Sequence, residues 1–181
     1  MIFRFDDVCA NTDMEKLIAM SDFIRERFKC LVQYSVSLLI NDTSELAGVQ
    51  REFVFLPIYK AYSDHRNFFK VDAFAYPRDE PSYVKLLSHG LVHVNHQMLC
   101  REAQEMSILI SCSLIGTDTF VPPFNKWNMD TESICREHGL HLQKFEDGWL
   151  GVEHNAFKPQ QQLWYTHSRN MTLDELKAWA Q

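Results

Sequence analysis

The sequence has no apolar run approaching the roughly 20 residues that cross a bilayer, so we expect no membrane span. It also has no basic, apolar leader at its start, and Asp6 and Asp7 come too early for a signal peptide. Its five cysteines are odd in number and scattered, with no Cys-x-x-Cys pair. These absences favour a cytoplasmic protein whose thiols are reduced.

A basic excess is absent as well. The 18 lysines and arginines are outnumbered by 24 acidic residues, which gives a net charge of −6. This balance argues against a nucleic-acid partner, which would require a basic surface. The sequence has neither a Gly-rich phosphate loop nor the His-Glu-x-x-His helix of zinc proteases. With no internal repeat or linker, residues 1–181 are expected to form a single domain around one substantial core.

What the sequence does contain is an alternation of strand and helix patterns. Strands are predicted at residues 2–5, 33–40, 84–87, 119–121, 140–145 and 163–165. Helices are predicted at residues 14–28, 97–114, 131–138 and 173–180. Strands that alternate with helices imply an α/β fold with a parallel sheet, either a barrel or a doubly wound fold, whose active residues lie at the carboxyl ends of the strands.

Several helix ends carry capping signals. Thr12 and Thr172 each begin a Thr-x-x-Glu capping box, and Asp130 is a candidate cap for the helix that follows it. Gly139 stands where a left-handed residue ends a helix. Residues 41–81 fit no such pattern and are interpreted as an irregular insertion with one β-like run at 52–57.

Two adjacent aspartates, Asp6 and Asp7, follow the first predicted strand. Neighbouring residues on an extended strand point to opposite faces, so both carboxylates can serve one pocket only where the backbone turns. At such a turn one carboxylate can bind a cation while the other stays free as a base. The alternative is an exposed acidic turn, or a local cap at Asp7.

A His-x-x-x-His pair, His89 and His93, follows the strand predicted at 84–87. A spacing of four places two imidazoles on one side of a helical turn, within reach of one metal ion. Gly90 relieves the backbone where the strand turns. With the acidic pair, these histidines would form a metal site beside a spare carboxylate, as metal-assisted hydrolysis requires. Two alternatives stay open: surface histidines in a loop, and a pair formed by His93 and His96.

Two further segments are candidates for the site. Pro122 and Pro123 stop a strand and hold the following loop extended, which leaves Phe124 and Trp127 available to flank a ligand. Aromatic walls suit the C–H faces of sugar rings, although a structural turn with core aromatics would look the same. His167 ends the last predicted strand, at the rim where such folds build sites, and its alternative is a solvated histidine.

Taken in order, these elements resemble the polysaccharide deacetylase family, the NodB-homology metal-dependent carbohydrate esterases. The matching segments are Phe5-Asp6-Asp7, His89-Gly90-Leu91-Val92-His93, Pro123-Phe124, Gly148-Trp149 and the strand-end His167. The residues of these motifs are similar to those of the divergent intracellular branch of the family. The resemblance implies a distorted (β/α) barrel with fewer than eight strands, and a carbohydrate or sugar-containing small molecule as the binding partner.

The resemblance also implies roles for the residues. Asp7, His89 and His93 would hold a divalent metal, with zinc as the expected ion. Asp6 would be the general base and His167 the general acid that removes acetyl from an N-acetylated sugar or glycan precursor. Five residues would contact the substrate: Pro123, Phe124, Trp127, Asn128 and Trp149. Two histidines and one carboxylate suit this chemistry, because they leave coordination positions for water and the acetamide oxygen.

One position departs from the family pattern. Many members carry an arginine two residues before the proline of the Pro-aromatic loop, where it orients the base aspartate, and this sequence has Val121. Arg4 is near Asp6 in the sequence, but we expect its side chain to face away. Two other interpretations therefore stay open: a non-catalytic, metal-retaining carbohydrate-binding or scaffold protein, and a phosphoesterase that uses the same ligands.

Overall fold

The computed structural model describes residues 2–8, 12–37, 81–91, 93–144, 156–158, 163–167 and 171–179. The described residues form one seven-stranded sheet in the order β5-β4-β3-β2-β1-β7-β6. Six strands are parallel, and β6 alone is antiparallel to its neighbour β7. The predicted α/β class with a parallel sheet is therefore confirmed. Within the described residues β5 and β6 are the two edges of the sheet, so closure into a barrel stays a prediction.

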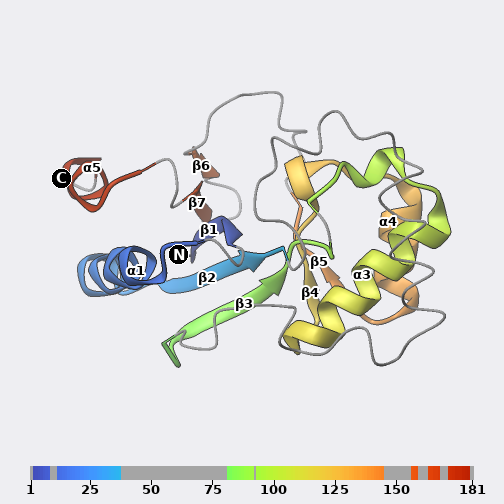
Figure 1. Cartoon of the computed structure of the whole chain (residues 1–181), viewed down its shortest axis with the longest axis horizontal. Helices are drawn as coiled ribbons and strands as arrows, with labels where there is room; N and C mark the ends of the chain where they lie inside the picture. Colours follow the sequence, from blue (N-terminus) through green and yellow to red (C-terminus); the bar gives the residue numbers. More distant parts are fainter. Residues whose placement is uncertain are drawn as a thin grey trace.

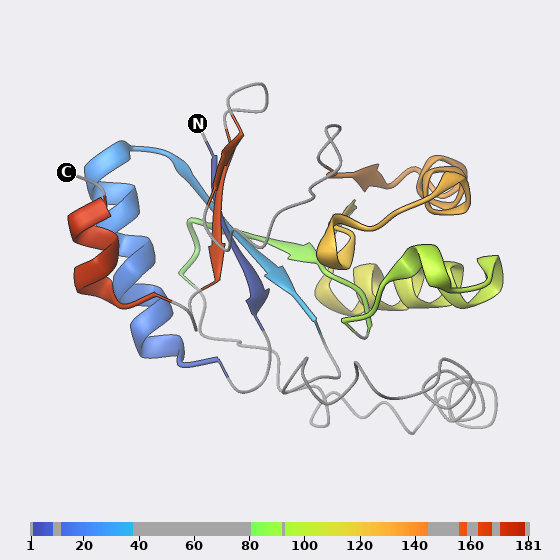
Figure 2. The same cartoon turned by 90° about the horizontal axis from the view of Figure 1, so that it is seen from above.

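The strands are β1 (Ile2–Val8), β2 (Leu31–Val36), β3 (Val84–Ser88), β4 (Thr119–Phe120), β5 (His141–Leu142), β6 (Ala156–Lys158) and β7 (Leu163–His167). The α-helices are α1 (Met14–Phe28), α3 (Arg101–Ile115), α4 (Met129–Glu137) and α5 (Leu173–Trp179), with 3-10 turns at His96–Met98 and Pro123–Asn125. Helices α1 and α5 lie side by side at one end of the molecule, and α3 and α4 lie at the other end beside β4 and β5 (Figures 1 and 2). None of the described helices is long and apolar enough to cross a membrane.

Helix α1 covers one face of the central strands. Leu17, Met20 and Ile24 recur at helical spacing, are fully buried, and pack in one cluster with Phe3 and Phe5 of β1. Burying an apolar side chain of this size contributes about 1.5–3 kcal/mol, so this stripe fixes the helix against the sheet.

The N-cap of α1 is Asp13, whose side chain accepts a hydrogen bond from the backbone N–H of Lys16 at 3.0 Å. The predicted box beginning at Thr12 is therefore wrong by one residue, because the aspartate carboxylate reaches the exposed N–H group itself. The box at Thr172 is confirmed, since Glu175 accepts from the Thr172 backbone at 2.7 Å and Thr172 Oγ1 accepts from the Glu175 backbone at 3.1 Å.

Helix α4 begins at Met129, two residues before its predicted start. Asn128 is the N-cap: its side chain accepts from the Thr131 backbone, and Thr131 returns a hydrogen bond to the Asn128 backbone. Asp130 lies inside the first turn instead of capping it. Gly139 has a φ of +67°, which confirms the predicted left-handed residue after this helix.

The bounds of other elements also differ from the predicted ones. Helix α3 begins at Arg101, later than predicted, because residues 96–98 form a separate 3-10 turn. Strand β6 has no counterpart among the predicted strands. The insertion predicted at 41–81, its β-like run, and the end of the strand predicted at 33–40 lie outside the described residues, except for Ser37 and Pro81.

The opposite face of β1 and β2 is polar although it is buried. Arg4 and Asp6 on β1, and Gln33 and Ser35 on β2, alternate with the apolar residues that face α1, and none exceeds 7% exposure. Arg4 and Gln33 are Cα partners in the parallel register. Burying polar groups costs free energy unless they are paired. A buried polar face on β1 and β2 therefore indicates that a functional site lies on this side of the sheet.

Candidate metal centre

The backbone of β1 changes direction where its two aspartates stand. The pairing of β1 with β2 shifts between Phe5 and Val8, and Asp7 has a φ of +59°, a left-handed conformation that few non-glycine residues adopt. Asp6 stays in register with β7, opposite His167. Both aspartates therefore lie within β1, not after it as predicted, and the expected turn is a bulge that frees Asp7 from the alternation of the strand.

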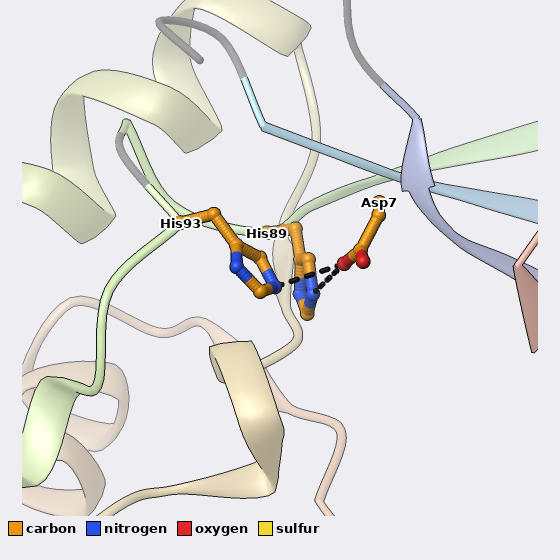
Figure 3. A group of neighbouring side chains, drawn as sticks. All are labelled: Asp7, His89 and His93. Atoms are coloured by element: carbon orange, nitrogen blue, oxygen red, sulfur yellow. Dashed lines mark ion pairs between the residues drawn. The ribbon is translucent and has the colours of Figure 1, made fainter. Parts of the chain in front are cut away.

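Asp7, His89 and His93 converge at the carboxyl ends of β1 and β3 (Figure 3). The Asp7 Oδ1 atom lies 2.8 Å from His93 Nε2 and 3.3 Å from His89 Nε2. One potential ligand atom from each side chain lies within 4.8 Å of the other two. All three side chains are at most 6% exposed, so the cluster is closed to bulk water on most sides.

The two histidines converge through a sharp turn, and the predicted helical turn is wrong. The His89 backbone N–H still donates to Val36 of β2 at 2.8 Å, which holds His89 at the end of the sheet. Gly90 then has a φ of +88°, a conformation that glycine adopts without strain, as predicted. The imidazole centroids of His89 and His93 lie 4.9 Å apart. Turn geometry therefore replaces helical spacing as the cause of the pairing.

The tautomer of His89 suits a metal ligand. Its Nδ1 lies 2.8 Å from the carbonyl oxygen of Val121, and because a carbonyl only accepts, Nδ1 is the donor. The form of this ring that would bind a metal ion, with its proton on Nδ1, has its lone pair on Nε2, the atom on the side of Asp7. A metal-binding histidine commonly donates a hydrogen bond from its other ring nitrogen to a backbone carbonyl.

The Asp7 carboxyl is ionised within this cluster. Burial alone would raise its pKa, but the hydrogen bonds and charges of His89 and His93 outweigh burial and hold the pKa well below its ordinary value. A buried carboxylate and two imidazoles with Nε2 atoms directed at it are a donor set that divalent transition metals accept. The residues therefore fit the expected metal.

His96 is separate from the cluster and anchors the loop behind it. Its Nδ1 donates to the Val94 carbonyl at 3.0 Å, so its Nε2 accepts from Ser107 Oγ at 3.2 Å, and Ser107 Oγ accepts from the Leu91 backbone at 3.2 Å. Complete burial lowers the pKa of His96 to about 3, so the ring is neutral. This relay joins backbone groups on both sides of His93, and sequence reasoning missed it.

Asp6 has a partner of its own on the same strand. Arg4 Nε donates to Asp6 Oδ1 at 2.6 Å, and Arg4 Nη2 donates to Asp6 Oδ2 at 2.9 Å. The expectation that Arg4 faces away is wrong, because residues two apart on a strand share a face. The period of the strand was the signal that would have found this pair.

His167 joins the same end of the sheet. Its Nε2 lies 3.4 Å from Asp7 Oδ2, and its side chain is 13% exposed, more than those of the other three cluster residues. Strand β7 places it there because β7 runs parallel to β1 and ends level with Asp6. Asp7 is thus within contact distance of three other predicted site residues: His89, His93 and His167.

The predicted substrate contacts divide into two groups. The ring of Phe124 is 44% exposed and stands edge-on to His93, with centroids 4.4 Å apart. Pro123, the residue before it, is buried. Trp127 instead packs under the Lys144 ammonium at 3.5 Å, and Asn128 is occupied as the cap of α4. Trp149 lies outside the described residues.

No protein-family model and no curated protein matches the chain. Among solved structures, it is similar to a family 4 carbohydrate esterase from Streptomyces lividans in complex with acetate, with a TM-score of 0.52 and 12% identity over 97% of this chain and 81% of that chain. It is also similar to a wild-type CE4 family pseudoenzyme from Bacillus anthracis, with a TM-score of 0.53 and 11% identity over 99% of this chain and 60% of that one. At these identities the likeness shows the fold alone. The described chain has the α/β fold of the family 4 carbohydrate esterases, and the divergent intracellular branch stays an expectation.

Proposed function

We propose that the protein is a metal-dependent hydrolase that removes an acetyl group from an N-acetylated carbohydrate. The observation that carries the proposal is the convergence of Asp7, His89 and His93 at the strand ends, beside a second carboxylate, Asp6, that has a separate partner. A structural ion cluster would not need the second carboxylate. A hydrolase needs one carboxylate for the metal and another for the proton.

Asp7, His89 and His93 would hold the metal, which when bound supplies a Lewis acid for the acyl carbonyl and lowers the pKa of water. Their Nε2 and Oδ1 atoms all face one point of the fold. The cluster is largely dry, and a dry site strengthens each of its electrostatic interactions.

Asp6 and His167 divide the proton transfers in this proposal. Asp6 takes a proton from the water whose oxygen attacks the acyl carbon. His167 donates a proton to the amine nitrogen as the carbon–nitrogen bond breaks, so that acetate and a free amine leave. Their Cα atoms are register partners on adjacent strands, a position that supports action on one acyl group. His167 is also the most exposed side chain of the cluster, as suits a group that meets the departing amine.

The carbohydrate part of the proposal is supported by Phe124. Its exposed ring stands beside His93 and offers an apolar face at the edge of the cluster. The similar Streptomyces lividans protein is a carbohydrate esterase and was captured with acetate, the product expected here.

Acetate release from a panel of N-acetylated sugars and nucleotide sugars tests the proposal, using metal-reconstituted protein. Activity that requires both the metal and Asp6 is expected, with Asp6→Asn as the matched control because it keeps shape and removes the base. Turnover that is unchanged in Asp6→Asn, or in metal-free protein, would contradict the mechanism.

A second candidate is a carbohydrate-binding protein that retains the metal without turnover. Two observations favour it: the similar Bacillus anthracis protein is a pseudoenzyme, and Val121 replaces the arginine of the family pattern. Stoichiometric metal binding, sugar binding in calorimetry and no acetate release across the panel would support this alternative over the hydrolase.

A further inference from the structure

We propose that Arg4 is the positioning residue of Asp6, and that β1 therefore carries both the base and the cation that orients it. The inference rests on the proposed function, in which Asp6 is the base. It does not require any side chain from the Pro-aromatic loop, where Val121 is apolar and 2% exposed.

The contact between Arg4 and Asp6 fixes the orientation of the Asp6 carboxylate as well as its distance from Arg4. Arg4 uses two nitrogens, Nε and Nη2, to reach the two oxygens of Asp6 at 2.6 and 2.9 Å. A single hydrogen bond lets a carboxylate rotate about it, whereas two parallel bonds fix the plane of the group as well. The direction in which Asp6 presents its remaining lone pairs is thereby set by Arg4.

Burial makes the pair mutually dependent. Arg4 is 2% exposed and Asp6 is 7% exposed, so neither charge is solvated to a useful extent. A buried charge without a partner is strongly destabilising. Among the described side chains, Arg4 is the one that forms an ion pair with Asp6. The sequence therefore keeps the two residues together on the same face of one strand.

Arg4 also separates the tasks of two adjacent carboxylates. Asp7 faces His89, His93 and His167, while both oxygens of Asp6 are taken by Arg4. Without the arginine, Asp6 would be a free carboxylate next to an imidazole cluster and could act as a further ligand. A carboxylate that binds the metal cannot also accept the proton, so Arg4 preserves the division on which hydrolysis depends.

Two variants of Arg4 test this role. Arg4→Lys keeps the charge and loses the two-pronged contact, and Arg4→Met keeps most of the length and loses both. We expect kcat to fall about 10–100-fold in each, since a misplacement near 1 Å can cost about 100-fold. KM should stay within about threefold, and metal affinity should not weaken. A structural role alone would weaken metal binding and turnover together.

The matched control is Gln33→Leu, which removes another buried polar side chain from the same face, at the register position opposite Arg4. Gln33 hydrogen-bonds Gln143, and this variant should keep the wild-type kcat. If Arg4→Met fails to fold, the double variant Arg4→Met/Asp6→Asn removes the unpaired charge. Because Arg4 acts through Asp6, the double variant should be no slower than Asp6→Asn alone.

A kcat in Arg4→Met equal to wild type, or a double variant much slower than Asp6→Asn, would overturn the inference. A wild-type protein with no turnover would instead contradict the proposed function. In that case crystal structures of Arg4→Met and Gln33→Leu decide the positioning role on their own. The Asp6 carboxylate should leave its place in the first variant and keep it in the second, and an unmoved Asp6 in Arg4→Met would refute the role of Arg4.

Discussion

The carbonyl oxygen of Val121 accepts a hydrogen bond from His89 Nδ1 at 2.8 Å. The position that departs from the family pattern thus supports a metal-ligand candidate through its backbone, which any residue at 121 supplies. The loss of an arginine side chain there need not disturb His89. The absence of an arginine at position 121 is also weak support for the non-catalytic interpretation, because Asp6, which that arginine would orient, has Arg4 as its partner.

Asp7→Ala, His89→Ala and His93→Ala should each lose the bound metal. Removal of a supporting residue typically weakens metal binding about 10–100-fold, so removal of a ligand should weaken it further. Metal content after dialysis, measured by atomic emission, checks this prediction. His138→Ala is the control, because His138 is exposed and pairs with Glu105 away from the cluster. Full metal content in all three variants would mean that the cluster is not the metal site.

His167→Ala should slow turnover while the metal stays bound. The side chain lies 3.4 Å from Asp7 Oδ2, and under the proposal it protonates the departing amine. General acid catalysis contributes about 100–10,000-fold, so a loss of kcat in that range is expected. Parallel measurement of kcat and metal content checks the role. Metal lost together with activity would reassign His167 as a ligand.

Ser107→Ala should weaken metal binding although none of the hydrogen bonds of Ser107 reaches Asp7, His89 or His93. Its hydroxyl joins the Leu91 backbone to His96, and so fixes the loop that carries His93. We expect about a 10-fold weaker metal Kd, the lower end for outer supports of a metal site. Competition with a chelator measures the Kd. Ser113→Ala, on the exposed face of α3, is the matched control, and equal Kd values for the two variants would exclude this support.

The stability of the metal-free protein should fall as pH falls from about 6.5 toward 3, because of His96. Its pKa is about 3 in the folded protein and about 6.5 in an unfolded chain, so the unfolded chain takes up the proton first. This contribution is complete above pH 6.5 and decreases by at most about 1.4 kcal/mol per pH unit below it. Urea unfolding at pH 7, 6 and 5 measures the slope. His96→Gln should show a shallower slope and His138→Gln should not; identical slopes in all three proteins would disprove the assignment.

Phe124→Ala should raise KM with little change in kcat. The ring stands at the edge of the cluster against His93, where it can pack on a sugar. Aromatic packing of this kind contributes about 0.5–1.5 kcal/mol, equivalent to a KM increase of about 2–12-fold. Leu114→Ala, with a comparable exposure of 39% on α3, is the control. An unchanged KM would place the substrate elsewhere.

The candidate site could be predicted from the sequence for residues whose position depends on the end of a nearby strand. Asp7 and His167 lie within the last two residues of β1 and β7, His89 directly follows β3, and parallel strands bring such ends together. The sharp turn at Gly90 also follows from one residue. The reason given for the His89–His93 pairing was wrong, because a four-residue spacing has the same appearance in a helix and around a turn.

The remaining contacts depend on partners that spacing does not reveal. The His96–Ser107 hydrogen bond joins residues 11 apart, and the His89–Val121 bond uses a backbone oxygen, which has no sequence signature. Among the described strands, β6 pairs with β7 alone, and its three residues are too few for a period to be recognised in the sequence. The Arg4–Asp6 pair was within reach of the sequence, since a strand period of two predicts it directly.

The left-handed backbone at Asp7 has a consequence for how this site can change over time. A non-glycine residue in that conformation costs on the order of 1 kcal/mol, so a change to glycine at this position relieves the backbone while it deletes the carboxylate. Backbone strain alone therefore favours the loss of Asp7, whereas the contacts of its carboxylate with His89, His93 and His167 oppose it. A relative with glycine at this position is therefore expected to have replaced the histidines that face it as well.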